Sequence, residues 1–597
     1  MRSLARLPLV FALALLLTNV VRAQTCTTEW AQPADGVWTD AASWTAGVPG
    51  AGDTACITVG GTYTVSLGVS DPISIAGLDL GGPNGTQTLE ARRQFSITCN
   101  ARVGTRGQLL VGSTSVFDFF RVDGTLLIEG LARLGPTRFM DTGGTLDIAP
   151  NGRVTVLRGT TASDASATFR VRGTLDTEGC GQPAQAGTCA VNAVLDVDGG
   201  TIRSPEGLLT LRGGGTLTNI TVGAAANAFL QFSRFAGVTG TYVLTGTMRG
   251  TPEGVVSMQG GNLAAGSGTA VLDVGGSGLR FAGGFGAESF LTSAGGEFLN
   301  TGRLVQANNA FTGVRTVVLR NQGVIAERSG LILVDGATVR NEPDGLIVLG
   351  EDNSSGVIVG NGRVINEGRI VGVNTAFPVS ISDDLLVSEP GSVLESSGVR
   401  LNLTGDAARV TPADVTLTGT GGFLFTDVVH QGTVSPGTEA QPIATLTFRN
   451  GTFRPSPFAG VPQLVIDVDE GGVSDQIAVP ASTGGQTVQL AGALVVRVRP
   501  GYVPTLGDTF TILTAPSAIE GRFGQTAVEG APDGLTFVTE PADNDRAVQL
   551  RAVEVAPDGP VTVSTTDPVG GGVRSVFLTG PGVVGVTAAR LDCTTCL

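Results

Sequence analysis

Four acidic side chains between residues 467 and 475 form the group whose residue types and spacing best suit chemistry. Asp467, Asp469, Glu470 and Asp475 occur together in "LVIDVDEGGVSDQIAV". Oxygen ligands at this spacing suit calcium, but the sequence contains no EF-hand loop and no nonapeptide calcium repeat. Two interpretations stay open, a calcium site and the solvated face of a strand followed by a loop. We expect no cofactor, with calcium as the alternative.

Composition excludes several common catalytic arrangements. The chain has no lysine, which a phosphate-binding P-loop requires, and only one histidine, His430, which we interpret as a loop residue. Carboxylates on one side of a repeat domain would suit cleavage of polysaccharides. Asp196 and Asp198 in "LDVDGG" are candidates, but they equally suit a turn. We therefore predict no catalysis, with a polysaccharide lyase or hydrolase as the alternative.

All three tryptophans of the chain lie at positions 30, 38 and 44. An aromatic ligand site is one interpretation of this clustering. The other is a cap, because a repeat domain needs an atypical end that covers its apolar interior. We predict a cap over residues 24–70, in which Trp38 and Trp44 are buried against the strands that follow. Exposure of both indoles along one groove would instead favour the ligand site.

The N-terminus and the seven cysteines indicate export. A basic start, the apolar run "LPLVFALALLL" and a small-residue site ending at Ala23 predict a signal peptide over residues 1–23. Disulfides are allowed in an exported protein. The spacing suggests a pair in each of three segments and leaves Cys99 over; the pairs are Cys26–Cys56, Cys180–Cys189 and Cys593–Cys596.

These residues must be positioned by strands, because residues 71–430 consist of short apolar runs broken by Gly, Asn and Asp. In one region the runs repeat, with Asn300, Asn321, Asn341 and Asn366 spaced by 21, 20 and 25 residues. A period of this length is typical of a solenoid, and about 16 coils would fit between residues 70 and 430. A series of separate β-sandwiches is the competing interpretation.

Stacking of the coils explains the repeated residues. Asparagine side chains can hydrogen-bond along such a stack, and asparagine at a turn accepts a left-handed backbone. A glycine follows each asparagine and is expected to take backbone angles that other residues avoid; these are Gly302, Gly323, Gly345 and Gly368.

Residues 431–552 alternate regularly between apolar and charged positions. "QLVIDVDEGG" and "GALVVRVRPGY" predict two half-buried strands in which Asp467 and Asp469 face Arg497 and Arg499. This segment, including "GTVSPG" and "LGDTFTILTAPSAIEGRF", resembles the C-terminal part of autotransporter passenger regions. The opening "GVWTDAASWTAGVPGAGDTACI" is similar to the segment with which many such passengers begin.

The resemblance implies a right-handed parallel β-helix that is exported, often displayed on the cell surface, and without catalytic residues. True autotransporters continue into a membrane β-barrel, which we do not expect in this chain. Residues 553–597 form a tail to which we assign no role.

Charge and hydropathy limit the partners. A net charge of −15 disfavours nucleic acid, whose binding depends on neutralising phosphates, and no apolar run after the signal peptide is long enough for a transmembrane helix. We therefore expect an all-β solenoid that is secreted or held on the outer surface of a bacterium. Its expected role is structural or adhesive, as a monomer, with surface glycans or other surface proteins as partners. A polysaccharide-active or glycan-binding β-helix protein is the alternative.

Overall fold

The computed structural model describes residues 25–555 apart from short internal gaps, and two further strands at 562–565 and 576–579. The gaps are residues 69–71, 93, 113–117, 136, 140–142, 158–160, 163–165, 182–188, 235–239, 283–288, 308–311, 329–330, 353–354, 374–375, 383–384, 405–408, 412–414, 426–427, 431, 450–453, 456–462 and 482–487. The predicted signal peptide, most of the predicted tail, and the cysteines at its end (Cys593 and Cys596) lie outside the described residues.

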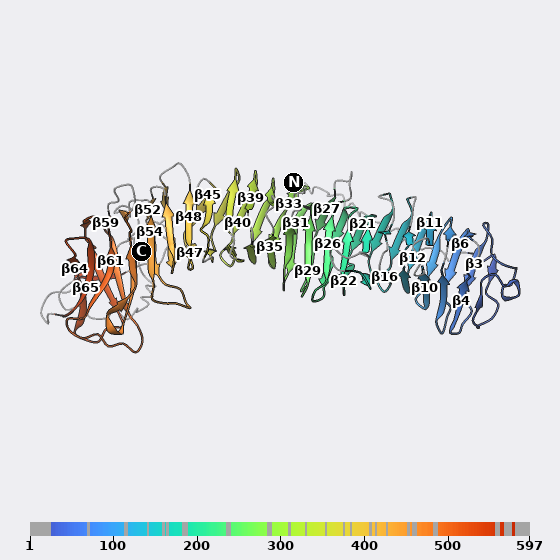
Figure 1. The fold of residues 1–597 in the computed structure, drawn as a ribbon, viewed down its shortest axis with the longest axis horizontal. Coiled ribbons are helices and arrows are strands. Elements are labelled where there is room, and N and C mark those ends of the chain that lie inside the picture. Colours follow the sequence, from blue (N-terminus) through green and yellow to red (C-terminus); the bar gives the residue numbers. More distant parts are fainter. Residues whose placement is uncertain are drawn as a thin grey trace, which may run out of the picture.

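The chain forms a long all-β rod (Figure 1), most of which is built from three sheets of parallel strands. We call them the first, second and third sheet, in the order in which the chain visits them. The earliest complete coil contains β3 (Thr54–Ile57), β4 (Tyr63–Leu67) and β5 (Ile73–Ile75). The next coil begins with β6 (Gly77–Leu80), which pairs with β3. The solenoid has about 15 turns, close to the number that the repeat spacing predicts.

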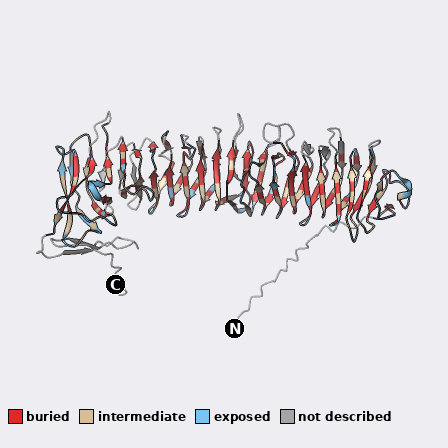
Figure 2. Ribbon diagram, turned by 60° about the horizontal axis from the view of Figure 1, so that its bottom comes forward, coloured by how far each residue is buried: buried red, intermediate tan, exposed pale blue. Residues whose placement is uncertain are grey.

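The interior of the rod consists of apolar columns that run from coil to coil. Parallel pairing is in register, so the same strand position lies directly above its counterpart in the preceding coil. One such column of fully buried side chains in the first sheet is Ile57, Leu80, Val103, Ile128, Ile148, Val171, Val197 and Leu217. Figure 2 shows buried residues repeating along the whole rod. No single coil can bury these side chains, because each needs a neighbour above and below.

The four repeated asparagines end successive strands of the second sheet, which are β34 (Gly296–Asn300), β37 (Val318–Asn321), β40 (Thr338–Asn341) and β43 (Arg363–Asn366). The prediction of a left-handed backbone is wrong for them and for the glycines that follow, since none of these residues has a positive φ. The glycines are needed for close approach instead. A Cβ atom on Gly345 would lie 2.3 Å from the carbonyl oxygen of Asn321 in the coil below.

The cross-section of the rod changes after residue 388. The second sheet ends with β46 (Leu386–Ser388), and a short sheet follows it, made of β49 (Arg409–Thr411), β52 (Val428–His430) and β55 (Arg454–Pro455). His430 is therefore the last residue of a strand, paired with Thr411, and the loop interpretation is wrong.

Parallel stacking in the first and third sheets continues past residue 430. The first sheet adds β58 (Gln476–Ala478) and β61 (Thr509–Thr514) and then closes with two antiparallel strands, β65 (Ala547–Glu554) and β64 (Leu535–Ala542). The described ranges contain only two 3-10 helices, η1 (Ala41–Ser43) and η2 (Glu470–Gly472). No helix in them is long and apolar enough to cross a lipid bilayer.

Candidate functional site

The tryptophan segment lies over the first coils of the solenoid. Strand β1 (Thr28–Glu29) pairs with β3, and β2 (Gly36–Val37) pairs with β4. Trp38 and Trp44 are 0% and 4% exposed, and Trp30 is buried beside them. The ring of Trp38 lies 4.8 Å from that of Trp44 and 5.8 Å from Phe95 in the second coil. The indoles are thus buried against the coils, as a cap requires, and are not exposed along a groove.

Hydrogen bonds and a disulfide fix this segment. Trp44 donates its Nε1–H to the carbonyl oxygen of Trp38 at 2.7 Å, whereas the buried Nε1 of Trp38 has no partner. Cys26 and Cys56 form a disulfide that ties the chain before β1 to β3. The two cysteines are 30 residues apart in sequence, and the cross-link lowers the conformational entropy of the unfolded chain by closing a loop between them.

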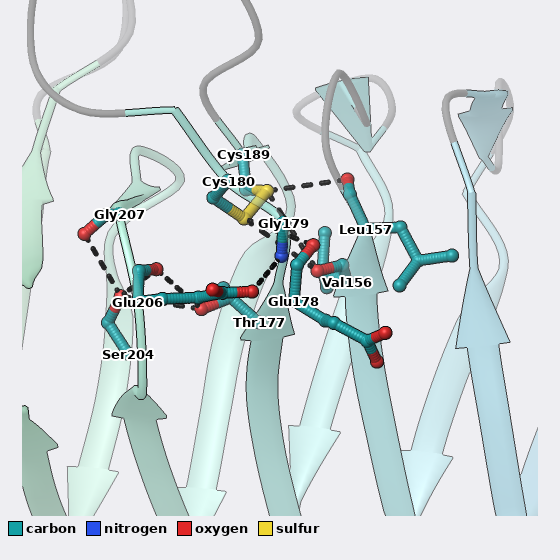
Figure 3. Close-up of a disulfide and its surroundings, with 10 residues drawn as sticks. All are labelled: Val156, Leu157, Thr177, Glu178, Gly179, Cys180, Cys189, Ser204, Glu206 and Gly207. Carbon is teal, nitrogen blue, oxygen red and sulfur yellow. Dashed lines mark hydrogen bonds between the residues drawn. A yellow bond between two sulfur atoms is a disulfide. The ribbon is translucent and has the colours of Figure 1, made fainter. Parts of the chain in front are cut away.

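A second disulfide, Cys180–Cys189, closes the excursion between β19 (Thr174–Glu178) and β20 (Cys189–Val191). Figure 3 shows it packed against the preceding coil, where the sulfur of Cys189 lies 3.3 Å from the carbonyl oxygen of Leu157. On its other side Gly207 approaches so closely that a Cβ atom would lie 1.9 Å from the carbonyl oxygen of Cys180. Both disulfides therefore serve to hold segments of the solenoid together. Cys99 is an exposed free cysteine.

The asparagines form a continuous buried ladder along the second sheet. Asn300 donates its Nδ2–H to Asn321 Oδ1 at 2.7 Å, Asn321 donates to Asn341 at 2.7 Å, and Asn341 donates to Asn366 at 2.8 Å. All four side chains are 0% exposed. The ladder begins above Leu272, so Asn300 Oδ1 has no partner. Apart from Asn300 Oδ1, these buried side chains are hydrogen-bonded along the stack, which assigns them to stability rather than to ligand binding.

The four acidic residues predicted from the sequence are not arranged as a metal site. Asp475 is 1% exposed, and its two carboxylate oxygens accept hydrogen bonds from the backbone N–H groups of Ala444 and Asp467 at 2.8 Å and 3.0 Å. Asp469 accepts from the N–H of Glu470 and lies 3.6 Å from Arg499. Among the described residues, no group of three or more His, Cys, Asp or Glu side chains is placed to hold a metal ion.

The interpretation of Asp475 as a solvated strand or loop residue is also wrong. Strand β57 (Val473–Ser474) folds back antiparallel on β56 (Gln463–Asp469), and this turn carries Asp475 beneath the surface. The predicted facing of the two strands does occur, since β56 pairs with β60 (Ala493–Val498) and places Asp467 beside Arg497.

Burial of Asp475 predicts that this region loses stability as the pH rises. Desolvation raises the pKa of Asp475 to about 7, and it also raises the pKa of Asp467 despite the charges of Arg497 and Arg499. The folded state therefore holds protons that the unfolded state has released above pH 4. The contribution to stability is full below pH 4 and is lost progressively as the pH rises to about 7.

We expect the free energy of unfolding around β56 to fall by a few kcal/mol between pH 5 and pH 8. Hydrogen exchange of the Ala444 and Asp467 amides, corrected for intrinsic rate, measures this. The variant Asp475→Asn should remove most of the pH slope and leave only the smaller part that Asp467 contributes, whereas Asp198→Asn at an exposed strand position should leave the slope unchanged. A slope in Asp475→Asn as steep as that of the parent would contradict the assignment to Asp475.

The remaining carboxylates on the sides of the rod are largely held by arginines of neighbouring coils. Asp196 accepts from Arg170 Nε at 3.0 Å, and Asp147 pairs with Arg172 at 2.7 Å. Asp196 and Asp198 lie in β21 (Val194–Asp198), so the alternative that placed them in a turn is wrong. Asp176 is fully buried beneath two arginines, Arg153 and Arg203.

The same pairing occurs nearer the middle of the rod. Arg328 Nε lies 2.9 Å from Glu351, which also pairs with Arg303. Burial opposes the ionisation of Glu351, but the hydrogen bonds and charges of Arg328 and Arg303 lower its pKa. Such a carboxylate stays ionised at neutral pH and is held in place, which suits neither a proton donor nor a mobile base.

A surface groove of about 460 Å³ lies where the cross-section of the rod changes. It crosses three strands of the first sheet, the beginnings of β48 (Arg400–Thr404) and β51 (Gly422–Phe425) and the length of β54 (Thr445–Arg449). The residues before β45 (Val379–Ser382) form one side of it. Its lining contains two arginines and three threonines and no carboxylate: Arg400, Arg449, Thr420, Thr445 and Thr447. No sequence motif indicates this groove, because its lining comes from separate segments between residues 376 and 449.

Comparison with known proteins does not assign this chain to a family. No protein-family model matches the chain, and no curated protein matches it. What the chain does is therefore inferred from its fold and from the geometry of these sites.

Proposed function

We propose that this chain is an exported bacterial protein whose β-solenoid serves as a non-catalytic rod, with a structural or adhesive role outside the cell or on its surface. One observation carries the proposal. Carboxylates along the sides of the rod, such as Asp147, Asp176 and Glu351, are paired with arginines of neighbouring coils. They stabilise the stacking of coils and are not gathered around an open reaction site.

Two further features support this role. The disulfides Cys26–Cys56 and Cys180–Cys189 suit an oxidising compartment. The segments that resemble autotransporter passengers suit a protein displayed at the cell surface. We propose that the rod acts as a monomer, because the tryptophan segment and the antiparallel strands β65 and β64 cover the ends of the first sheet.

Fractionation of the native cells, followed by a glycan-binding and degradation screen, tests the proposal. We expect the protein in the extracellular or outer-surface fraction, with binding to surface components and no change in the size of any glycan. Release of reducing ends or unsaturated sugars would overturn it in favour of a polysaccharide-active enzyme. Retention in the cytoplasm would contradict the proposed location.

A further inference from the structure

The groove between residues 376 and 449 owes its shape to the turns that lead into the first sheet. Gly398 and Gly421, in the turns before β48 and β51, line the groove, as do Ala376, Phe377 and Pro378 before β45. In register across the three strands, Gly422 lies between Arg400 and Thr447. A Cβ atom on Gly422 would lie 2.7 Å from the carbonyl oxygen of Thr447, so glycine allows the close approach of β51 and β54, and no side chain rises between Arg400 and Thr447.

The charge of the groove is opposite to that of the whole protein. The chain carries a net charge of −15, yet Arg400 and Arg449 both line the groove and no acidic residue does. Neither arginine forms an ion pair with a residue that the structure describes, and Arg400 only donates to the neutral amide of Asn402, at 2.9 Å. By contrast, Arg369 on the neighbouring third sheet pairs with Glu395. Unpaired guanidinium groups in a hollow are suited to bind carboxylates.

The uncharged lining suits a sugar ring. The side chain of Phe377 is prominent on the surface, since the residue is 55% exposed. Such a face can pack against the apolar C–H face of a pyranose. The hydroxyl groups of Thr445 and Thr447 project from β54 on the same side as Arg449 and can bond to sugar hydroxyls.

We propose that this groove binds an acidic polysaccharide through the carboxylates of its uronic acid units. The proposal deepens the adhesive role given above and rests on it. Arg400 and Arg449 lie on strands separated by one further strand and are offset by two residues along the strands, which places their backbones about 12 Å apart. The ligand is therefore an oligomer that presents successive carboxylates along the groove, and a single uronic acid is expected to bind much more weakly.

Isothermal titration calorimetry or microscale thermophoresis with the mature chain tests the assignment of the groove to an acidic polysaccharide. The probes are a uronic acid oligomer, the corresponding monomer, a sulfated oligosaccharide and a neutral oligosaccharide of the same length. We expect the uronic acid oligomer to bind most tightly, with an affinity that falls as the salt concentration rises. Arg400→Gln and Arg449→Gln should each weaken binding roughly ten-fold or more, because each removes a charge-assisted hydrogen bond. Phe377→Ala should weaken binding to a smaller extent.

The matched control is Arg249→Gln in β28 (Thr247–Gly250), an exposed arginine far from the groove that gives the same change in net charge. It should leave the affinity unchanged, and all variants should keep the unfolding midpoint of the parent. Failure of the oligomer to bind, or equal weakening by Arg249→Gln and Arg400→Gln, would overturn the groove assignment. Tighter binding of the sulfated probe would overturn the choice of carboxylates. Glycan binding that ignores the groove variants would leave the adhesive role standing, whereas glycan turnover would remove the proposed function itself.

Discussion

Replacing Trp38 with alanine is expected to destabilise the first coils of the solenoid by about 3 to 5 kcal/mol. The indole is fully buried between Trp44 and Phe95 and connects the cap to the second coil. Its loss leaves a cavity at the end of the rod, where only one neighbouring coil is present to close around it. Hydrogen exchange of the amides of β3 to β6, together with denaturant unfolding, measures the effect.

Two phenylalanine variants separate packing from hydrogen bonding in this cap. Trp38→Phe loses no hydrogen bond, because its Nε1 has no partner, whereas Trp44→Phe loses the bond to the carbonyl oxygen of Trp38. We therefore expect Trp44→Phe to cost about 1 kcal/mol more than Trp38→Phe beyond their similar loss of volume. If Trp38→Ala left the exchange of the first coils unchanged, the segment would not be a cap.

Interrupting the asparagine ladder at its centre is expected to have an effect of similar size. Asn341→Leu removes the acceptor used by Asn321 and the donor used by Asn366. Both partners are fully buried, so two polar groups lose a bond without gaining water. A cost of about 2 to 6 kcal/mol follows, at 1 to 3 kcal/mol for each buried group.

Position along the ladder provides the control. Asn300→Leu removes one amide whose Oδ1 already lacks a partner, and it leaves only Asn321 Oδ1 unsatisfied. The variant at the ladder's end should therefore cost about half as much as the one at its centre. Equal effects of the two substitutions on the unfolding midpoint would mean that leucine costs the same through packing alone, and that the ladder is not cooperative.

The repeat in the sequence was sufficient to predict the solenoid, because a parallel stack in register forces equivalent residues into equivalent places. Asn300, Asn321 and Asn341 are each preceded, two positions earlier, by an apolar residue. In the structure the asparagines pair with one another in adjacent strands, and so do these apolar residues. The same pattern does not determine the backbone angle of a turn. Gly345 was needed for the close approach of two coils and not for a positive φ, and sequence spacing cannot distinguish these reasons.

The groove and the buried carboxylate were not predictable in this way. Arg400 and Arg449 are 49 positions apart in the sequence, and only the stacking of β48, β51 and β54 brings them to the same groove. Asp475 follows a polar, glycine-rich stretch that indicates an exposed loop, yet the antiparallel return of β57 buries it. Both features arise from irregular departures from the repeat, where periodicity carries no information.

The direction of the asparagine ladder has a consequence for how this rod could change length. Every inner member accepts from the coil before it and donates to the coil after it, in the same sense throughout. A tandem duplication of one coil, such as residues 322–341, would insert one asparagine that both accepts and donates, and it would create no new unsatisfied group. The ladder is therefore compatible with growth or shortening by whole coils, so that genetic duplication can adjust the reach of the protein without redesign of its interior.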